Sequence, residues 1–239
     1  MNNAVIRKIE ALRSEFLEWF AIYRRNNPGK NPVITGFNMP YSVRGTWDTG
    51  NDTLLLTINP KAEDSEPYQI PEETWPGINE LFNAQFGTRS KFDKAISQVA
   101  QVLGDTREKA ASDYAMWSVV PYRSSNAEKV PDELWKKAAG EVWDPIFRLW
   151  LPSRIFVFGK TAHGVIRETL LKHAALQQNE QERHNPGTAS DFMHSLFKSP
   201  AGKTIRLFRM PHPSQWSRFY TGERSQALEF IRDMYAGKY

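Results

Sequence analysis

The chain contains four short apolar runs that are typical of buried β-strands, and each stops at a residue that interrupts regular structure. They are rich in β-branched, aromatic and leucine residues, and polar residues follow each of them. A proline closes three of the runs, and a proline cannot continue a hydrogen-bonded ladder. The four predicted strands are residues 53–58, 114–120, 155–159 and 205–210.

Helical periodicity fills much of the chain around these runs. Apolar residues recur at spacings of three and four along an N-terminal segment, residues 4–25, and along five later segments. In one of these, residues 132–149, Pro145 is expected to kink the helix because it has no amide hydrogen. The other predicted helices are residues 78–86, 90–103, 160–173 and 222–235.

Strands separated by helical crossovers predict an α/β fold with a mostly parallel sheet that is covered on both faces. Residues 192–197 and 204–210 flank a short Pro/Gly-containing segment, so we expect a hairpin to deliver the last strand. With 239 residues and 40% hydrophobic content the chain can build one large core. We predict a single domain over residues 1–239, in which residues 1–50 provide a packed helix and a connection.

Composition removes several kinds of chemistry. The chain has no cysteine, which excludes disulfides, thiolate zinc sites and a cysteine nucleophile. The net charge of +4 and the pI of about 9.2 permit a polyanionic partner without requiring one. Residues 1–8 lack an apolar signal core, and no run approaches the roughly 20 apolar residues of a membrane helix. We therefore expect a soluble, cytoplasmic protein that does not enter a membrane.

Polar residues that follow parallel strands gather at one edge of the sheet, and open α/β sheets bind their ligands there. A phosphate-loop interpretation of Gly159-Lys160-Thr161 fails, because Arg154 occupies the position of the glycine that opens such a loop. A dinucleotide fingerprint is absent too. The polar strand-end segments are Asn59-Pro60, residues 118–123, Gly159-Lys160 and residues 212–214.

In order and spacing these segments resemble the uracil-DNA glycosylase superfamily, whose members cut the bond between a base and its deoxyribose. Residues 57–60, Thr-Ile-Asn-Pro, match the Asn-Pro of the motif Gly-x-Asn-Pro that mismatch- or single-strand-specific members carry after strand one. Residues 212–214, His-Pro-Ser, match the second motif in full. Residues 158–162, Phe-Gly-Lys-Thr-Ala, fit the family's apolar strand followed by Gly-Lys-x-Ala. The resemblance spans roughly residues 50–225.

The resemblance implies a three-layer α/β/α sandwich with a central, mostly parallel four-stranded sheet. It also implies a monofunctional DNA glycosylase that flips a base from DNA and needs neither metal nor cofactor, and we expect a monomer. Asn59 would orient the attacking water, and His212 would donate a hydrogen bond to a base carbonyl as negative charge develops there. Backbone N–H groups around Ser214 would bind phosphate.

One departure from the family bears on the substrate. Ser118 stands where the family's base-reading Asn makes two hydrogen bonds to uracil, and a serine hydroxyl is shorter and less selective. Uracil and a hypermodified cytosine of the kind found in phage genomes remain two substrate hypotheses, the second of which would make the protein an anti-phage defence factor. Cytosine derivatives leave more easily when protonated, which gives the carboxylates past Asn59 an acid role to test. These are Glu63, Asp64 and Glu66.

Further candidates would hold the DNA. Residues 215–220 occupy the place of the family's wedge loop. There Arg218 or Phe219 would fill the gap left by the flipped base, and Trp216 or Tyr220 would stack on a base. The aromatic candidates for the pocket wall are Phe37, Tyr68 and Tyr122, and the candidate phosphate contacts are Lys61, Arg123, Lys160 and Arg218. Lys61 beside the site also leaves strand scission open.

The individual residues also have ordinary structural interpretations. An Asn before a proline is commonly a turn residue that bonds its own backbone, His212 suits a structural histidine, and Trp216 suits core packing. At the level of the whole protein, the main alternative is a module of the same fold that binds modified or damaged DNA without cutting it. A hydrolase of free nucleosides is a third hypothesis.

Overall fold

The structure is a computed structural model, and it describes most of the predicted core. The described residues are 34–37, 52–58, 91–124, 130–177, 181–183, 192–211 and 226–236, with scattered positions between 4 and 26. Those N-terminal positions are helical and nearly all exposed, which fits the polar face of the helix predicted there. The predicted helix at residues 78–86 lies outside the described residues.

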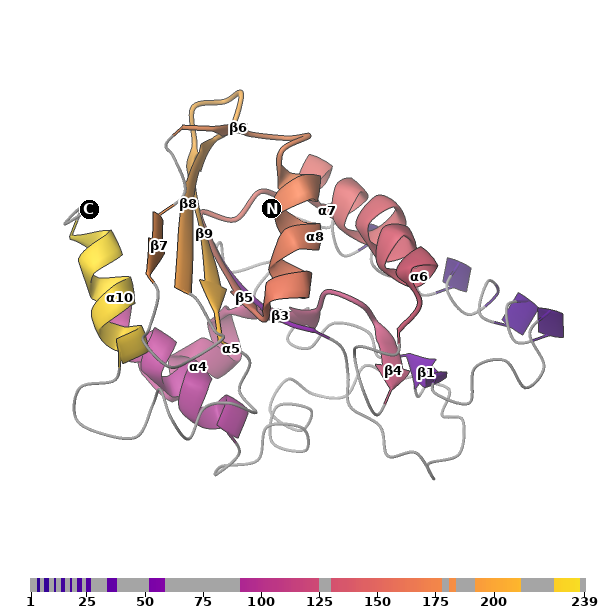
Figure 1. Ribbon diagram of the computed structural model, residues 1–239, viewed down its shortest axis with the longest axis horizontal. Helices are drawn as coiled ribbons and strands as arrows, with labels where there is room; N and C mark the ends of the chain where they lie inside the picture. Colours follow the sequence, from indigo (N-terminus) through magenta and orange to yellow (C-terminus); the bar gives the residue numbers. More distant parts are fainter. Residues whose placement is uncertain are drawn as a thin grey trace.

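The described elements alternate between strands and helices over most of the chain (Figure 1). The strands are β1 Ile34–Phe37, β2 Thr53–Thr57, β3 Ala115–Ser118, β4 Tyr122–Ser124, β5 Arg154–Phe158, β6 Ala175–Leu176, β7 Gln181–Arg183, β8 Phe192–Lys198 and β9 Thr204–Met210. The helices are α4 Lys91–Val102, α5 Arg107–Asp113, α6 Asp132–Lys137, the π-helical segment η2 Ala138–Trp143, α7 Asp144–Leu149, α8 Lys160–Leu170 and α10 Gln226–Tyr235.

The main sheet has seven strands, in the order β3-β2-β5-β9-β8-β6, with β7 also paired to β8. The first four of these strands are parallel, whereas β8 runs antiparallel to β9. The predicted α/β class and the predicted hairpin are thus confirmed. The predicted number of four strands is wrong for the whole sheet, because β8 forms a long ladder with β9 and itself pairs with the short strands β6 and β7.

Helices pack on both faces of this sheet, because its strands carry apolar side chains at successive positions. Leu54 and Leu56 of β2 belong to one buried cluster, which includes residues of α6, η2, α7 and α8. Leu55 belongs to a second cluster with residues of α4, α5 and α10. Figure 1 shows α10 and α4 on one side of the strands and α6, α7 and α8 on the other.

The helix predicted over residues 132–149 consists of α6, the π-helical segment η2 and α7, and it continues past Pro145. Pro145 lies in the first turn of α7, where its missing N–H costs little. Immediately before it, the Asp144 N–H donates to the Ala139 carbonyl, five residues back. The disturbance that the sequence predicts at the proline is therefore a change of helix type just before it.

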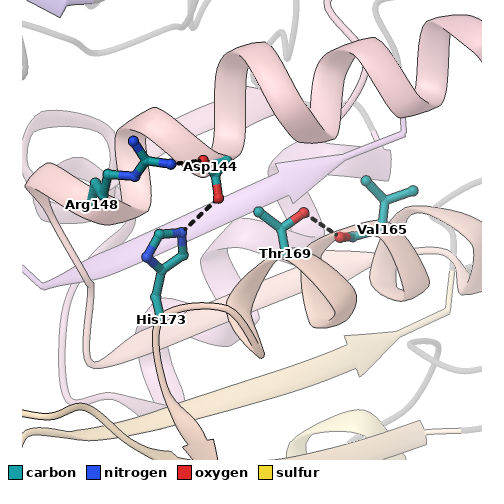
Figure 2. Close-up of polar contacts among 5 residues, drawn as sticks. All are labelled: Asp144, Arg148, Val165, Thr169 and His173. Atoms are coloured by element: carbon teal, nitrogen blue, oxygen red, sulfur yellow. Dashed lines mark hydrogen bonds and ion pairs between the residues drawn. The ribbon is translucent and has the colours of Figure 1, made fainter.

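A partly buried polar cluster links α7 to α8. His173 Nε2 lies 3.0 Å from Asp144 Oδ1, and Arg148 donates to the other carboxylate oxygen at 2.5 Å (Figure 2). The His173 ring also meets Phe147 edge-on at 6.4 Å between ring centroids. Asp144 and Arg148 belong to α7, and His173 follows α8, so this cluster fixes the two helices to each other.

The amino-terminal edge of the sheet has its own polar contacts. Lys203 Nζ donates to Asp52 Oδ1 at 2.8 Å and to the Leu151 carbonyl at 2.5 Å. Nearby, Arg206 stacks on the Tyr235 ring at 5.1 Å and donates to the Met234 carbonyl. These contacts attach the turn before β9 to the strand starts, and the last turn of α10 to the sheet.

His194 of β8 is buried on the face that α10 covers. It is 5% exposed, stacks on Phe208 at 4.7 Å, and its Nε2 has no hydrogen-bond partner within the described residues. Burial, with a smaller effect from the charge of Arg206, lowers the pKa of His194 from 6.5 to about 4. The folded protein therefore holds this imidazole neutral at pH values where the unfolded chain protonates it.

We predict that this difference destabilises the protein in acid. As the pH falls from 6.5 to about 4, the unfolded state binds the proton first, so His194 removes up to about 3 kcal/mol of stability across that window and nothing above it. His194→Leu should show a shallower loss of stability between these pH values, measured by urea unfolding. Equal slopes for variant and wild type would contradict the prediction.

Candidate functional site at the carboxyl edge of the parallel strands

The four parallel strands end level with one another. Thr57 of β2 pairs with Ser118 of β3, and Phe158 of β5 pairs with Met210 of β9. Backbone hydrogen bonds continue past the strands, from the Val119 N–H to the Thr57 carbonyl at 2.8 Å and from the Gly159 N–H to the Met210 carbonyl at 2.8 Å. The four chain segments that follow the strands therefore start from one common edge.

The strand order makes this edge a topological switch point. From β2 the chain passes through α4 and α5 to β3, whereas from β5 it passes through α8 and returns on the other side at β9. The helices of these two connections belong to opposite faces of the sheet. In open α/β sheets, the crevice outside two neighbouring strands whose connections diverge in this way is the usual ligand site. Here those strands are β2 and β5.

Gly159 brings the ends of these two strands into close contact. Its φ of +112° lies in a region that only glycine adopts readily, and a Cβ at this position would lie 2.8 Å from Ile58 Cδ1. The next residue, Lys160, is exposed and begins α8, whose first turn is closed by the His163 N–H donating to the Gly159 carbonyl at 3.0 Å. The backbone conformation and the close approach of Ile58 thus explain why residue 159 is a glycine.

The segment after β3 is fixed by contacts with η2. Trp143 of η2 is fully buried, and its Nε1 donates to the Val119 carbonyl at 2.8 Å. The Trp143 ring also packs against Trp117 at 5.2 Å. Val119, Val120 and Pro121 are buried. Residues 119–121 are therefore held rigidly at the carboxyl edge of the sheet.

A pair of hydroxyl groups joins the ends of β2 and β3. Thr57 Oγ1 and Ser118 Oγ are 2.9 Å apart, on the face of the sheet that α4 and α5 cover. Ser118 is 1% exposed, whereas Thr57 is partly exposed. Sequence reasoning selected Ser118 and overlooked Thr57, because the two residues are 61 positions apart and only the register of the strands makes them neighbours.

The structure places the sequence candidates as follows. Ser118 and Lys160 lie at the carboxyl edge, the first buried and the second exposed. Phe37 and Tyr122 are backbone partners in the small antiparallel sheet of β1 and β4, where Arg123 pairs with Gly36, and nothing is described of their side chains. The candidates outside the described residues are Asn59, Lys61, Glu63, Asp64, Glu66, Tyr68, His212, Ser214, Trp216, Arg218 and Phe219.

For the two catalytic candidates, the preceding residues are described. Ile58 follows β2 and Pro211 follows β9, and both strands pair with β5 from opposite sides. Two strand spacings of about 4.8 Å separate β2 from β9. Asn59 and His212 are the next residues along the chain.

Within the described part of the chain, no group of three or more His, Asp or Glu residues is arranged to hold a metal ion, and no helix is long and apolar enough to cross a membrane. A scan of the sequence against protein-family models finds no match, and a search of curated proteins finds none either. The assignment of function therefore depends on the sequence motifs and on the geometry of the sheet edge.

The contact between Gly159 and Ile58 gives a prediction of stability. Gly159→Ala should destabilise the protein by about 2–4 kcal/mol, because the new Cβ meets Ile58 in a backbone conformation that disfavours alanine. Gly164→Ala in α8 is the matched control: nothing lies within 4 Å of a Cβ there, so it should stabilise the protein by about 0.5–1 kcal/mol. Chemical denaturation measures both. If the two variants behave alike, the proposed constraint on Gly159 is wrong.

Proposed function

We propose that the protein is a DNA glycosylase that flips a base out of DNA and hydrolyses its N-glycosidic bond, leaving an abasic site. The fold would then be a uracil-DNA glycosylase-like sandwich extended by antiparallel strands. The observation that carries this proposal is the common carboxyl edge of β2, β3, β5 and β9, after which the four motif segments follow in the order the resemblance requires.

The chemistry assigns a different task to each strand end. Cleavage creates positive charge on the sugar and negative charge on the departing base, so the site needs a positioned water on one side and hydrogen-bond donors on the other. Asn59, after β2, orients the water through its amide oxygen. His212, after β9, donates to the base. The ends of β3 and β5 lie on either side of β2; the end of β3 lies beside the base, and the end of β5 supplies a phosphate contact through Lys160.

The substrate is an aberrant base, either a hypermodified cytosine or uracil. The first would make the protein a cytoplasmic defence factor against phage, and the second a base-excision repair enzyme. The proposed partner is DNA alone, bound by a monomer that needs neither metal nor cofactor. The net charge of +4 favours the required attraction to phosphate.

A panel of DNAs tests this function. Mass spectrometry should detect a free base, and alkaline cleavage should detect abasic sites, after incubation with DNA that contains uracil or glucosylated hydroxymethylcytosine. Binding to one of these DNAs without base release would favour the non-catalytic module. Cleavage of free nucleosides, with little dependence of affinity on salt, would favour the nucleoside hydrolase.

We predict that Asn59→Ala and His212→Ala each reduce the rate of base release by at least about a hundredfold, as expected when a positioned water or an anion-stabilising donor is lost. Affinity for the same DNA should stay within about threefold of wild type. Single-turnover kinetics and fluorescence anisotropy measure the two quantities separately. Unchanged release in both variants would rule out the assigned roles.

Lys160 gives a second prediction. Lys160→Met should weaken binding to all DNA sequences and reduce the slope of log affinity against log salt by about 1, because one phosphate contact is lost. Lys172→Met is the matched control, because Lys172 is exposed too and follows the other end of α8. Equal salt slopes for Lys160→Met and wild type would remove Lys160 from the interface.

A further inference from the structure

The hydroxyl pair at the ends of β2 and β3 lies at the carboxyl edge of the sheet. Thr57 and Ser118 are partners in the parallel register, and their oxygens are 2.9 Å apart. They are also two positions at which the sequence departs from the motifs it resembles. Where Gly-x-Asn-Pro has glycine this chain has Thr57, and where the base-reading Asn is expected it has Ser118. The structure shows that the two departures contact each other.

Counting hydrogens favours one direction for the bond between them. Each hydroxyl has one hydrogen to donate. If Thr57 donated to Ser118, the hydrogen of Ser118 would need another acceptor in the interior, since Ser118 is 1% exposed, and no further partner for it is found among the described residues. If Ser118 donates to Thr57, its own hydrogen is used and Thr57 keeps one. A buried hydroxyl without a partner is costly, so the second arrangement is favoured.

This arrangement leaves one donor at the edge. Thr57 is a partly exposed residue, and it lies two positions before Asn59 in the chain. Ser118 is buried and holds the Thr57 oxygen in place. The group available to a ligand is thus the O–H of Thr57 rather than that of Ser118.

We infer that the Thr57 hydroxyl donates a hydrogen bond to a flipped base whose ring nitrogen N3 carries no hydrogen, as in cytosine derivatives, and that Ser118 is a positioning residue for it. This inference rests on the proposed function. An amide presents a donor and an acceptor together, which suits the neighbouring N3–H and carbonyl of uracil. A single donor suits the N3 or O2 acceptor of a cytosine, and it withdraws electrons from the base as the base departs.

The test compares hydroxyl-keeping and hydroxyl-removing variants. Thr57→Val has nearly the same shape without the hydroxyl and should reduce kcat/KM on glucosylated hydroxymethylcytosine DNA about tenfold, the effect of one lost hydrogen bond. Thr57→Ser should stay within about twofold of wild type. Ser118→Ala keeps the Thr57 hydroxyl but removes the group that positions it, and should reduce kcat/KM about threefold. Thr204→Val, at an exposed position at the start of β9, is the control and should match wild type.

A paired substitution tests the coupling. Thr57→Gly combined with Ser118→Asn exchanges the hydroxyl pair for an amide with room beside it, and should shift the ratio of uracil release to cytosine-derivative release towards uracil by about tenfold or more. Ser118→Asn alone should not shift this ratio, because the introduced amide would clash with the Thr57 side chain. A structural role for the pair would change stability without moving this ratio, so thermal unfolding is measured alongside.

The possible results separate the two levels of the proposal. If wild type releases base but Thr57→Val matches it, the inference is overturned while the glycosylase function stands. If wild type binds modified DNA without cutting it, the affinity ratio of modified to plain DNA replaces kcat/KM, and loss of that ratio in Thr57→Val supports the inference. If wild type neither releases base nor discriminates, both proposals fail. If Thr57→Val does not fold, the results for Ser118→Ala and for the paired substitution decide whether the inference about Thr57 stands.

Discussion

The pairing of β5 with both of its neighbours is the constraint on which the rest of the structure depends. Leu55, Phe156 and Phe208 lie in one row across β2, β5 and β9, and all three are buried on the face that α4 and α10 cover. A slip of one residue in either pairing would move such a row to the opposite face, where side chains of other sizes pack. Core packing therefore sets the register, and the register brings the carboxyl ends of the strands to one level.

The main elements could be predicted from the sequence because their signals are local. Continuous apolar runs predicted all four parallel strands, and the Pro/Gly segment before β9 predicted the hairpin with β8. The strands β6 and β7 were not predicted, because β6 has only two residues and β7 is short and polar, and both are defined by their pairing with β8. The π-helical segment before Pro145 was also beyond the sequence pattern, since it shifts the hydrogen bonds without changing the apolar periodicity enough to detect.

The candidate site was predictable to a lesser degree. Motif order points to the carboxyl edge of the sheet, and the described ends of β2 and β9 lie on either side of β5 there. The contacts made within the edge could not be predicted. The closeness of Ile58 to Gly159 and the bond between Thr57 and Ser118 join residues far apart in the chain, and both depend on register rather than on local composition. A sequence pattern can say which strands end in polar residues, but only packing decides which of these residues touch.

The position of the hydroxyl pair also argues against a purely structural origin. The three residues before each hydroxyl, in β2 and in β3, are buried and apolar. Replacing both members of a buried hydrogen-bonded pair by apolar groups of similar shape is nearly neutral or even stabilising, so the fold gains little from hydroxyls at this level. The hydroxyl pair lies one pairing level above Leu56 and Trp117, and the residues that follow it, Ile58 and Val119, are apolar again. The two hydroxyls therefore interrupt an apolar pattern that continues beyond them, and core packing alone does not account for that interruption.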